Sequence, residues 1–392
     1  MLFDPRLVFL LLWSTQIAGQ LLAGDVFGQY SVLTWSAIAC AVLGFVAGST
    51  LGASLPILEN GAPGSTPDRR DPFVRRAFHW FVVLYGITGV LVLAKVYLIL
   101  RAQLGGAVTL PGIRQAIVFD FVGPRNIFSL LRVFFFGVGV CIYFVAHARS
   151  LSRWELLFVL MIGLLSALLT TGRLYMLMLF VAVTALLYRQ RIVTLRGVLS
   201  AAVGFMALFF LVAVLLGKGT SGGGVLRQVI WNAQIYLLSS VACLDNYIQT
   251  GLQEIPGGAL LPNSVRGLLH GFGVNIPLRP PLMPFVSVPM TCNTYTALFP
   301  LYHDGSLLGV LAGFFGIGLF HQLLYKWNLS SENPVAWYFY AVSLYPLCMS
   351  IFEDSYFSSP GFWILLWLPP VLYWLCQRAF RVPDKRAMWT AN

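Results

Sequence analysis

The chain has 392 residues, of which 58% are hydrophobic and only 10% are charged, and its formal net charge is +11 at pH 7. Soluble domains carry about 25% charged residues, so this composition excludes an ordinary soluble enzyme and indicates a polytopic membrane protein. In such a protein an excess of positive charge indicates how the chain is oriented in the membrane, because Lys and Arg accumulate in cytoplasmic loops. We therefore expect no nucleic-acid partner.

Long, continuous apolar runs predict helices rather than strands. A helical span needs about 20 apolar residues and satisfies its own backbone in lipid. The runs divide the chain into residues 1–216 with seven spans, a large outer loop over 217–303, and residues 304–392 with three spans and a basic tail. We predict an all-α polytopic membrane protein with about ten transmembrane helices and a large, partly helical outer loop. The ten predicted spans are 7–24, 31–53, 79–100, 127–147, 154–171, 174–188, 197–216, 304–326, 334–352 and 361–377.

Lys and Arg recur in the loops that alternation places on one side of the membrane. These loops are the polar, Pro-rich and Gly-rich stretch over 56–76, the connectors at 147–153, 189–196 and 326–334, and the tail from 377. Since each holds at least one cation, we expect this side to be cytoplasmic and to hold both termini. The loop over 217–303 then faces outward.

The outward face also carries cations, among them Arg173, Lys218, Arg266 and Arg279. An Arg guanidinium binds phosphate oxygens in pairs, so an anionic ligand is one reason to keep these residues there. Arg173 follows a tight turn over 170–172 between two short spans, and an Arg near membrane depth is usually partnered or functional. The alternative for each is a cation that reaches the lipid headgroups.

The outer loop contains several predicted elements. Its lead over 217–224 is rich in glycine but lacks the spacing of a nucleotide-binding phosphate loop. Apolar periodicity predicts a helix over 225–249 with Leu226, Ile230, Ala233, Leu237, Val241, Leu244 and Ile248 on one face. Prolines end that helix, a short helix is expected over 264–270, and residues 274–289 are expected to be extended. Cys243 and Cys292 are able to pair if this side is oxidising.

His303 and Asp304 stand where the outer loop re-enters the membrane. Histidine titrates near neutral pH and serves as a general base, and a partly buried aspartate does the same or orients a sugar hydroxyl. Tyr295 and Tyr302 are seven residues apart, which predicts one helical face suited to sugar rings; an interfacial aromatic belt is the alternative.

Other polar residues of the outer face are weaker candidates. His270 is a candidate binding residue whose alternative is a solvated loop histidine, and Asp245 and Glu254 are expected to solvate the loop. Glu353 and Asp354, between the last two spans, are candidates to line the same cavity. No CxxC or His/Cys ligand spacing occurs, so we predict no metal site.

Two motifs resemble a known family. Asn293-Thr294-Tyr295-Thr296-Ala297 followed by Tyr302-His303-Asp304-Gly305-Ser306-Leu307-Leu308-Gly309 looks like the signature of Wzy-type O-antigen and exopolysaccharide repeat-unit polymerases, and Thr170-Thr171-Gly172-Arg173 resembles their small-Gly-Arg turn. The order of the turn, a further span, the large outer loop and the signature also agrees, over about residues 165–320. The resemblance implies a GT-C-like architecture.

The resemblance implies a metal-independent glycosyltransferase without cofactors in a bacterial inner membrane, active on its periplasmic face. Its substrates would be undecaprenyl-diphosphate-linked oligosaccharides, and its partners membrane lipids, a chain-length regulator and a flippase. Arg173, His303 and Asp304 would be catalytic. The substrate would be bound by Lys218, Arg266, His270, Arg279, Asn293, Tyr295, Thr296 and Tyr302. An O-antigen ligase is the alternative, and a flippase fits less well because no internal repeat is visible.

Overall fold

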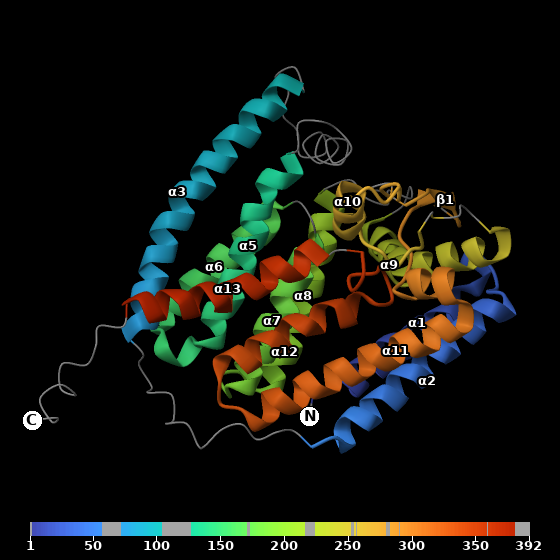
Figure 1. Cartoon of the computed structure of the whole chain (residues 1–392), viewed down its shortest axis with the longest axis horizontal. Coiled ribbons are helices and arrows are strands. Elements are labelled where there is room, and N and C mark those ends of the chain that lie inside the picture. The colour runs from blue at the N-terminus through green and yellow to red at the C-terminus, as the bar shows by residue number, and fades with distance from the viewer. Residues whose placement is uncertain are drawn as a thin grey trace, which may run out of the picture.

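The computed structural model describes residues 2–56, 72–103, 127–170, 173–215, 224–251, 255, 257–279, 283–289, 291–358 and 360–380. These residues are almost entirely helical (Figure 1). The exception is a two-stranded antiparallel pair, in which β1 (Val286–Ser287) aligns Val286 with Cys292 of β2 (Thr291–Cys292). The helices are α1 (Pro5–Phe27), α2 (Val32–Ser54), α3 (Pro72–Gln103), α5 (Ile127–Ala146), α6 (Arg153–Leu169), α7 (Arg173–Arg189), α8 (Leu195–Leu215), α9 (Val225–Thr250), α10 (Asn263–Gly271), α11 (Leu298–Ser330), α12 (Pro334–Met349) and α13 (Pro360–Phe380), with a short 3-10 turn at Ala148–Ser150.

Each of the ten predicted apolar spans falls on one of these helices, so the all-α expectation is confirmed. Within the described residues, four helical segments are long and apolar enough to cross a membrane, namely Pro5–Ala23, Val32–Ser54, Pro72–Ala102 and Leu298–Ser330. Further apolar helices are shorter, at Leu130–Ala146, Leu174–Arg189 and Leu195–Phe209. The chain is thus a helical protein of membrane character. Ten crossings and GT-C-like architecture remain predictions.

α2 and α11 lie side by side along one edge of the molecule (Figure 1). Gly44 and Gly48 of α2 approach the backbone of α11 so closely that an added Cβ would overlap the carbonyl oxygens of Leu311 and Phe315. Gly318 of α11 approaches Phe45 in the same way. Small residues at spacings of four are the usual device for close helix packing in membranes, where lipid removes the hydrophobic drive for association.

Two predicted helix starts were too late. α3 begins at Pro72 rather than at 79, and Arg75 in its first turns makes an ion pair of 3.1 Å with Glu155 of α6. α11 begins at Leu298 rather than at 304. It is kinked at Ser306, whose φ of 53° is unusual for a residue other than glycine. His303 and Asp304 therefore lie on a short helical segment before the kink and not in a loop.

α9 forms as predicted but does not bury its predicted apolar face throughout. Leu226 and Ile230 are exposed, whereas the polar Asn232 and Ser239 are buried. Asp245, expected to solvate the loop, is buried as well. Its carboxylate accepts hydrogen bonds from the backbone of Ser31 (2.8 Å) and the hydroxyl of Thr34 (2.7 Å), at the start of α2. A carboxylate at a helix N-terminus satisfies backbone donors and the helix dipole, so Asp245 fastens α9 to α2.

Candidate functional site

The signature segment is attached to α9 and to the loop after α12. Cys292 forms a disulfide with Cys243 of α9, which resolves the open pairing. The Thr294 hydroxyl lies 3.0 Å from the Ser240 hydroxyl of α9. The backbone N–H of Ala297 donates to the carbonyl of Ser350 over 3.0 Å. These contacts place the start of α11 between two elements that are distant in the sequence.

Tyr295 and Thr296 serve this local structure. Tyr295 is buried ahead of α11, so it does not share a helical face with Tyr302 as expected; its ring packs on Phe299 and its hydroxyl donates to the carbonyl of Pro284 over 3.3 Å. Thr296 is also buried, and its hydroxyl accepts from the backbone N–H of Leu298 over 3.2 Å, at the start of the helix.

Asp304 organises the turn before α10. Its carboxylate accepts the backbone N–H groups of Ala259 (2.6 Å) and Leu260 (2.8 Å). Gly258, with φ at +82°, faces the same carboxylate, and an added Cβ would lie 2.7 Å from Oδ2. Only glycine fits this close approach with a positive φ. Asp304 therefore holds the loop in place, because its carboxylate accepts hydrogen bonds from two consecutive backbone N–H groups.

His303 is held on both sides of its ring. Nε2 accepts the backbone N–H of Ile255 over 3.3 Å, so Nδ1 carries the proton and donates it to Asp304 Oδ1 over 2.6 Å. The ring also stacks on Tyr247 of α9 with centroids 6.0 Å apart. With Nε2 already occupied by a backbone donor, His303 in this state orients Asp304 and the loop.

Arg266 has 0% of its surface exposed. The guanidinium donates to the carbonyls of Leu261 (2.8 Å) and Pro277 (2.9 Å) and to that of Gly258. It was expected to hold a diphosphate, but these bonds direct it to the interior of its own loop. A buried charge needs such partners to offset its desolvation, so Arg266 braces the turn that Asp304 holds from the other side.

Arg279 is half-buried and lies between charges of both signs. One of its guanidinium N–H groups donates to the carbonyl of Ala259 over 2.6 Å. Burial lowers the pKa of Arg279, whereas the negative charges of Asp354 and Asp304 oppose that shift. An Arg guanidinium stays cationic at neutral pH. Arg279 thus lies within electrostatic range of carboxylates from two separate elements.

The loop between α12 and α13 brings two carboxyl groups to this cluster. Asp354 accepts the backbone N–H groups of Tyr356 (2.9 Å), Phe357 (3.0 Å) and Ser358 (2.8 Å), which fixes the loop. Glu353 accepts a single longer bond, from the Ser355 hydroxyl at 3.3 Å. Burial raises the pKa of Glu353 to about 7, with a smaller contribution from Asp354. A carboxyl group that titrates near neutral pH is suited to general acid–base work.

Glu353 also interacts electrostatically with Tyr175, in the first turn of α7. That helix begins at Arg173, whose own side chain is outside the described part of the structure. This electrostatic interaction indicates that the start of α7 lies near the loop that carries Glu353 and Asp354. The sequence flagged this acidic pair only as a secondary candidate; its position on the predicted outer face was the one signal available.

The remaining predicted residues are more peripheral or not described. Asn293 and Tyr302 are half-buried and His270 is exposed on α10. Lys218 lies outside the described residues, as does Glu254. Within the described part of the chain, no group of three or more His, Cys, Asp or Glu side chains is placed to hold a metal ion.

Comparisons with protein-family models, with curated proteins and with solved structures each return no match to this chain. The resemblance to the repeat-unit polymerases therefore depends on the quoted motifs alone. The geometry adds that three segments meet at one end of the helical bundle: the signature segment, the loop of Arg266 and Arg279, and the loop of Glu353 and Asp354.

Proposed function

We propose that the protein is a glycosyltransferase that polymerises oligosaccharide repeat units carried on undecaprenyl diphosphate. The observation that carries the proposal is the position of Arg279 within electrostatic reach of Asp304 and Asp354, from two different elements. A half-buried guanidinium in a partly desolvated site suits a leaving diphosphate, because fixed positive charge stabilises the negative charge that develops there.

In the proposed reaction, a hydroxyl of the acceptor sugar attacks the anomeric carbon of the donor, and the bond to the diphosphate breaks. The transition state resembles an oxocarbenium ion, as in glycoside hydrolysis. Glu353 takes the proton of the attacking hydroxyl, since its carboxyl titrates near the working pH. Arg279, together with Arg173 at the start of α7, binds the diphosphate. Asp304, His303 and Arg266 keep the loop of Arg279 in place.

The test is a repeat-length assay on membranes supplied with polyprenyl-diphosphate-linked repeat units. Arg279→Gln and Glu353→Gln are expected to abolish the ladder of longer products, whereas Arg227→Gln, an exposed arginine of α9, is expected to leave it unchanged. A normal ladder from both site variants would remove the site assignment. In a strain lacking the protein, products of one repeat support the polymerase, and long polymer that stays on its carrier supports the alternative ligase.

A further inference from the structure

The end of the bundle opposite the signature segment contains a cavity of about 410 Å³. It lies where α7 and α11 end and where α8 and α12 begin. Its lining includes Tyr188, Arg189, Arg191, Tyr325, Trp337 and Tyr340. This volume is within the range of small-ligand pockets, which combine apolar and aromatic walls with a few polar groups. The proposed glycosyl transfer does not use it.

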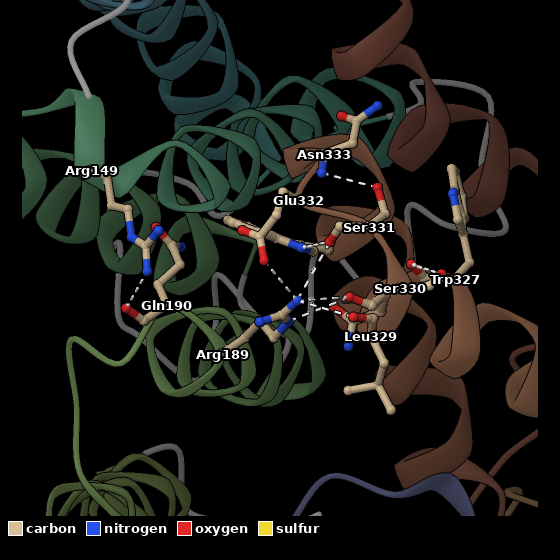
Figure 2. A network of polar contacts seen from close by, with 11 residues as sticks. Arg149, Arg189, Gln190, Trp327, Leu329, Ser330, Ser331, Glu332 and Asn333 are labelled. Atoms are coloured by element: carbon tan, nitrogen blue, oxygen red, sulfur yellow. Dashed lines mark hydrogen bonds and ion pairs between the residues drawn. The ribbon is translucent and has the colours of Figure 1, made fainter. Parts of the chain in front are cut away.

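Arg189 belongs to the wall of this cavity rather than to its binding groups. Its guanidinium donates to the carbonyls of Asn328 (3.2 Å) and Leu329 (3.5 Å) at the end of α11, and it lies 3.6 Å from Glu332 (Figure 2). It also lies over the ring of Trp337, 5.2 Å from the centroid. A cation at a helix C-terminus satisfies carbonyls that the helix leaves over. Arg189 therefore joins α7 to α11 and shapes the pocket.

Arg191 occupies a backbone position that usually favours glycine. The N–H of Ile192 donates to the carbonyl of Leu187 (2.9 Å) and that of Arg191 to Tyr188 (3.0 Å), which is the Schellman pattern at the end of α7. Arg191 has the left-handed backbone, with φ at 56°, that glycine usually supplies in this pattern. A strained residue at a pocket wall points to a use for its side chain, and the side chain of Arg191 is exposed.

Apolar side chains flank this cation. Ile192 is 45% exposed, Leu195 is 48% exposed, and Leu329 in the lining is 53% exposed. In a protein of membrane character such residues face lipid chains without cost. A soluble phosphate compound would gain nothing from them, whereas a phospholipid would place its headgroup by the guanidinium and its acyl chain along these residues. Basic pockets between transmembrane helices on the cytoplasmic side bind anionic headgroups, and this end is the predicted cytoplasmic one.

We propose that the pocket at the end of α7 binds the phosphate headgroup of an anionic phospholipid, with Arg191 as the cation that contacts the phosphate. The planar fork of Arg191 donates to two phosphate oxygens, and its exposed side chain is accessible to a lipid headgroup. The proposal is independent of the glycosyl transfer and concerns the opposite end of the molecule.

The test uses the full chain purified in detergent and measures bound lipid by native mass spectrometry and the melting temperature by fluorescence. The added probes are phosphatidylglycerol, phosphatidylcholine with the same acyl chains, and inorganic phosphate. Arg191→Gly removes the cation and relieves the backbone, so without lipid its melting temperature is expected to equal or exceed that of the native protein. Arg191→Asn, which tolerates the same backbone, is the second variant. Arg196→Gln is the matched control, since Arg196 is exposed near the pocket but does not line it.

The native protein and Arg196→Gln are expected to bind phosphatidylglycerol equally, and to bind it more tightly than phosphatidylcholine. Loss of a charge-assisted contact predicts binding about tenfold weaker in both Arg191 variants. Equal binding of the two lipids by the native protein, or native affinity in both variants, would overturn the proposal. So would stabilisation by inorganic phosphate alone at the level reached with phosphatidylglycerol, because the ligand would then be a soluble phosphate.

Discussion

Replacing Arg266 by methionine separates the two roles that the residue has been given. Methionine fills similar volume but leaves the carbonyls of Gly258, Leu261 and Pro277 without their guanidinium donor. Hydrogen bonds to a charged group contribute about 1.5–3 kcal/mol each, and an unsatisfied buried acceptor costs about 1–3 kcal/mol. Water entering the loop would offset part of this penalty, so we expect the free energy of unfolding to fall by about 3–5 kcal/mol.

The assay is limited proteolysis of the loop over 255–279 together with thermal unfolding in detergent. Arg266→Met is expected to be cut faster and to melt lower. Arg266→Lys keeps the charge but not the fork, so its loss should be intermediate. Arg227→Met, at an exposed site on α9, should behave as the native protein. If Arg266→Met retained native protease resistance and melting temperature but lost polymer, the guanidinium would be a substrate contact and the bracing role would be refuted.

Three further predictions concern Gly258 in the same loop, the packing of α2 on α11, and the titration of Glu353. Gly258→Ala should increase cleavage of the same loop, because the new Cβ meets Asp304 and the residue keeps a positive φ; native cleavage rates would contradict this reading. Gly48→Leu should lower the yield of folded protein in size-exclusion chromatography, since it separates α2 from α11, whereas Gly204→Leu, where an added Cβ meets nothing within 4 Å, should be tolerated. The pKa of Glu353 is raised from 4.5 to about 7. Between these two pH values the folded state therefore keeps a proton that the unfolded state has lost. Stability should fall by about 3 kcal/mol as pH rises across that window, and Glu353→Gln should remove this dependence in melting curves taken from pH 4 to pH 8.

Hydropathy predicts the helices of this chain well, because an apolar run of about 20 residues has few alternatives. It predicts their ends poorly. α3 begins at Pro72, a residue type favoured in the first turn of a helix, and its polar first turn carries an ion pair to Glu155 that hydropathy does not register. The early start of α11 involves the kink at Ser306, which separates a short buried segment from the longer apolar one.

The sequence named candidate residues but could not show what each of them contacts. The resemblance led to His303, Asp304 and the loop arginines, and in the structure Asp304 and Arg279 both bond to the backbone of Ala259. The roles depend on which backbone groups each side chain meets, and periodicity carries no information about that. Asp245 is an example. A charged residue on a helix of the outer loop is predicted to be solvated, yet Asp245 is buried because the first residues of α2 donate hydrogen bonds to it.

The two ends of α11 provide independent arguments for the same orientation. Near its start lies the disulfide between Cys243 and Cys292, a bond that persists in oxidising compartments and is rare in the cytosol. Near its end lie Arg189 and Lys326, which bond to backbone carbonyls of neighbouring helices, as the positive-inside rule expects of a cytoplasmic face. The disulfide reflects redox chemistry, whereas the cations reflect the distribution of charge. Their agreement favours an outward position for the site around Arg279, where a substrate carried on a lipid diphosphate would be presented.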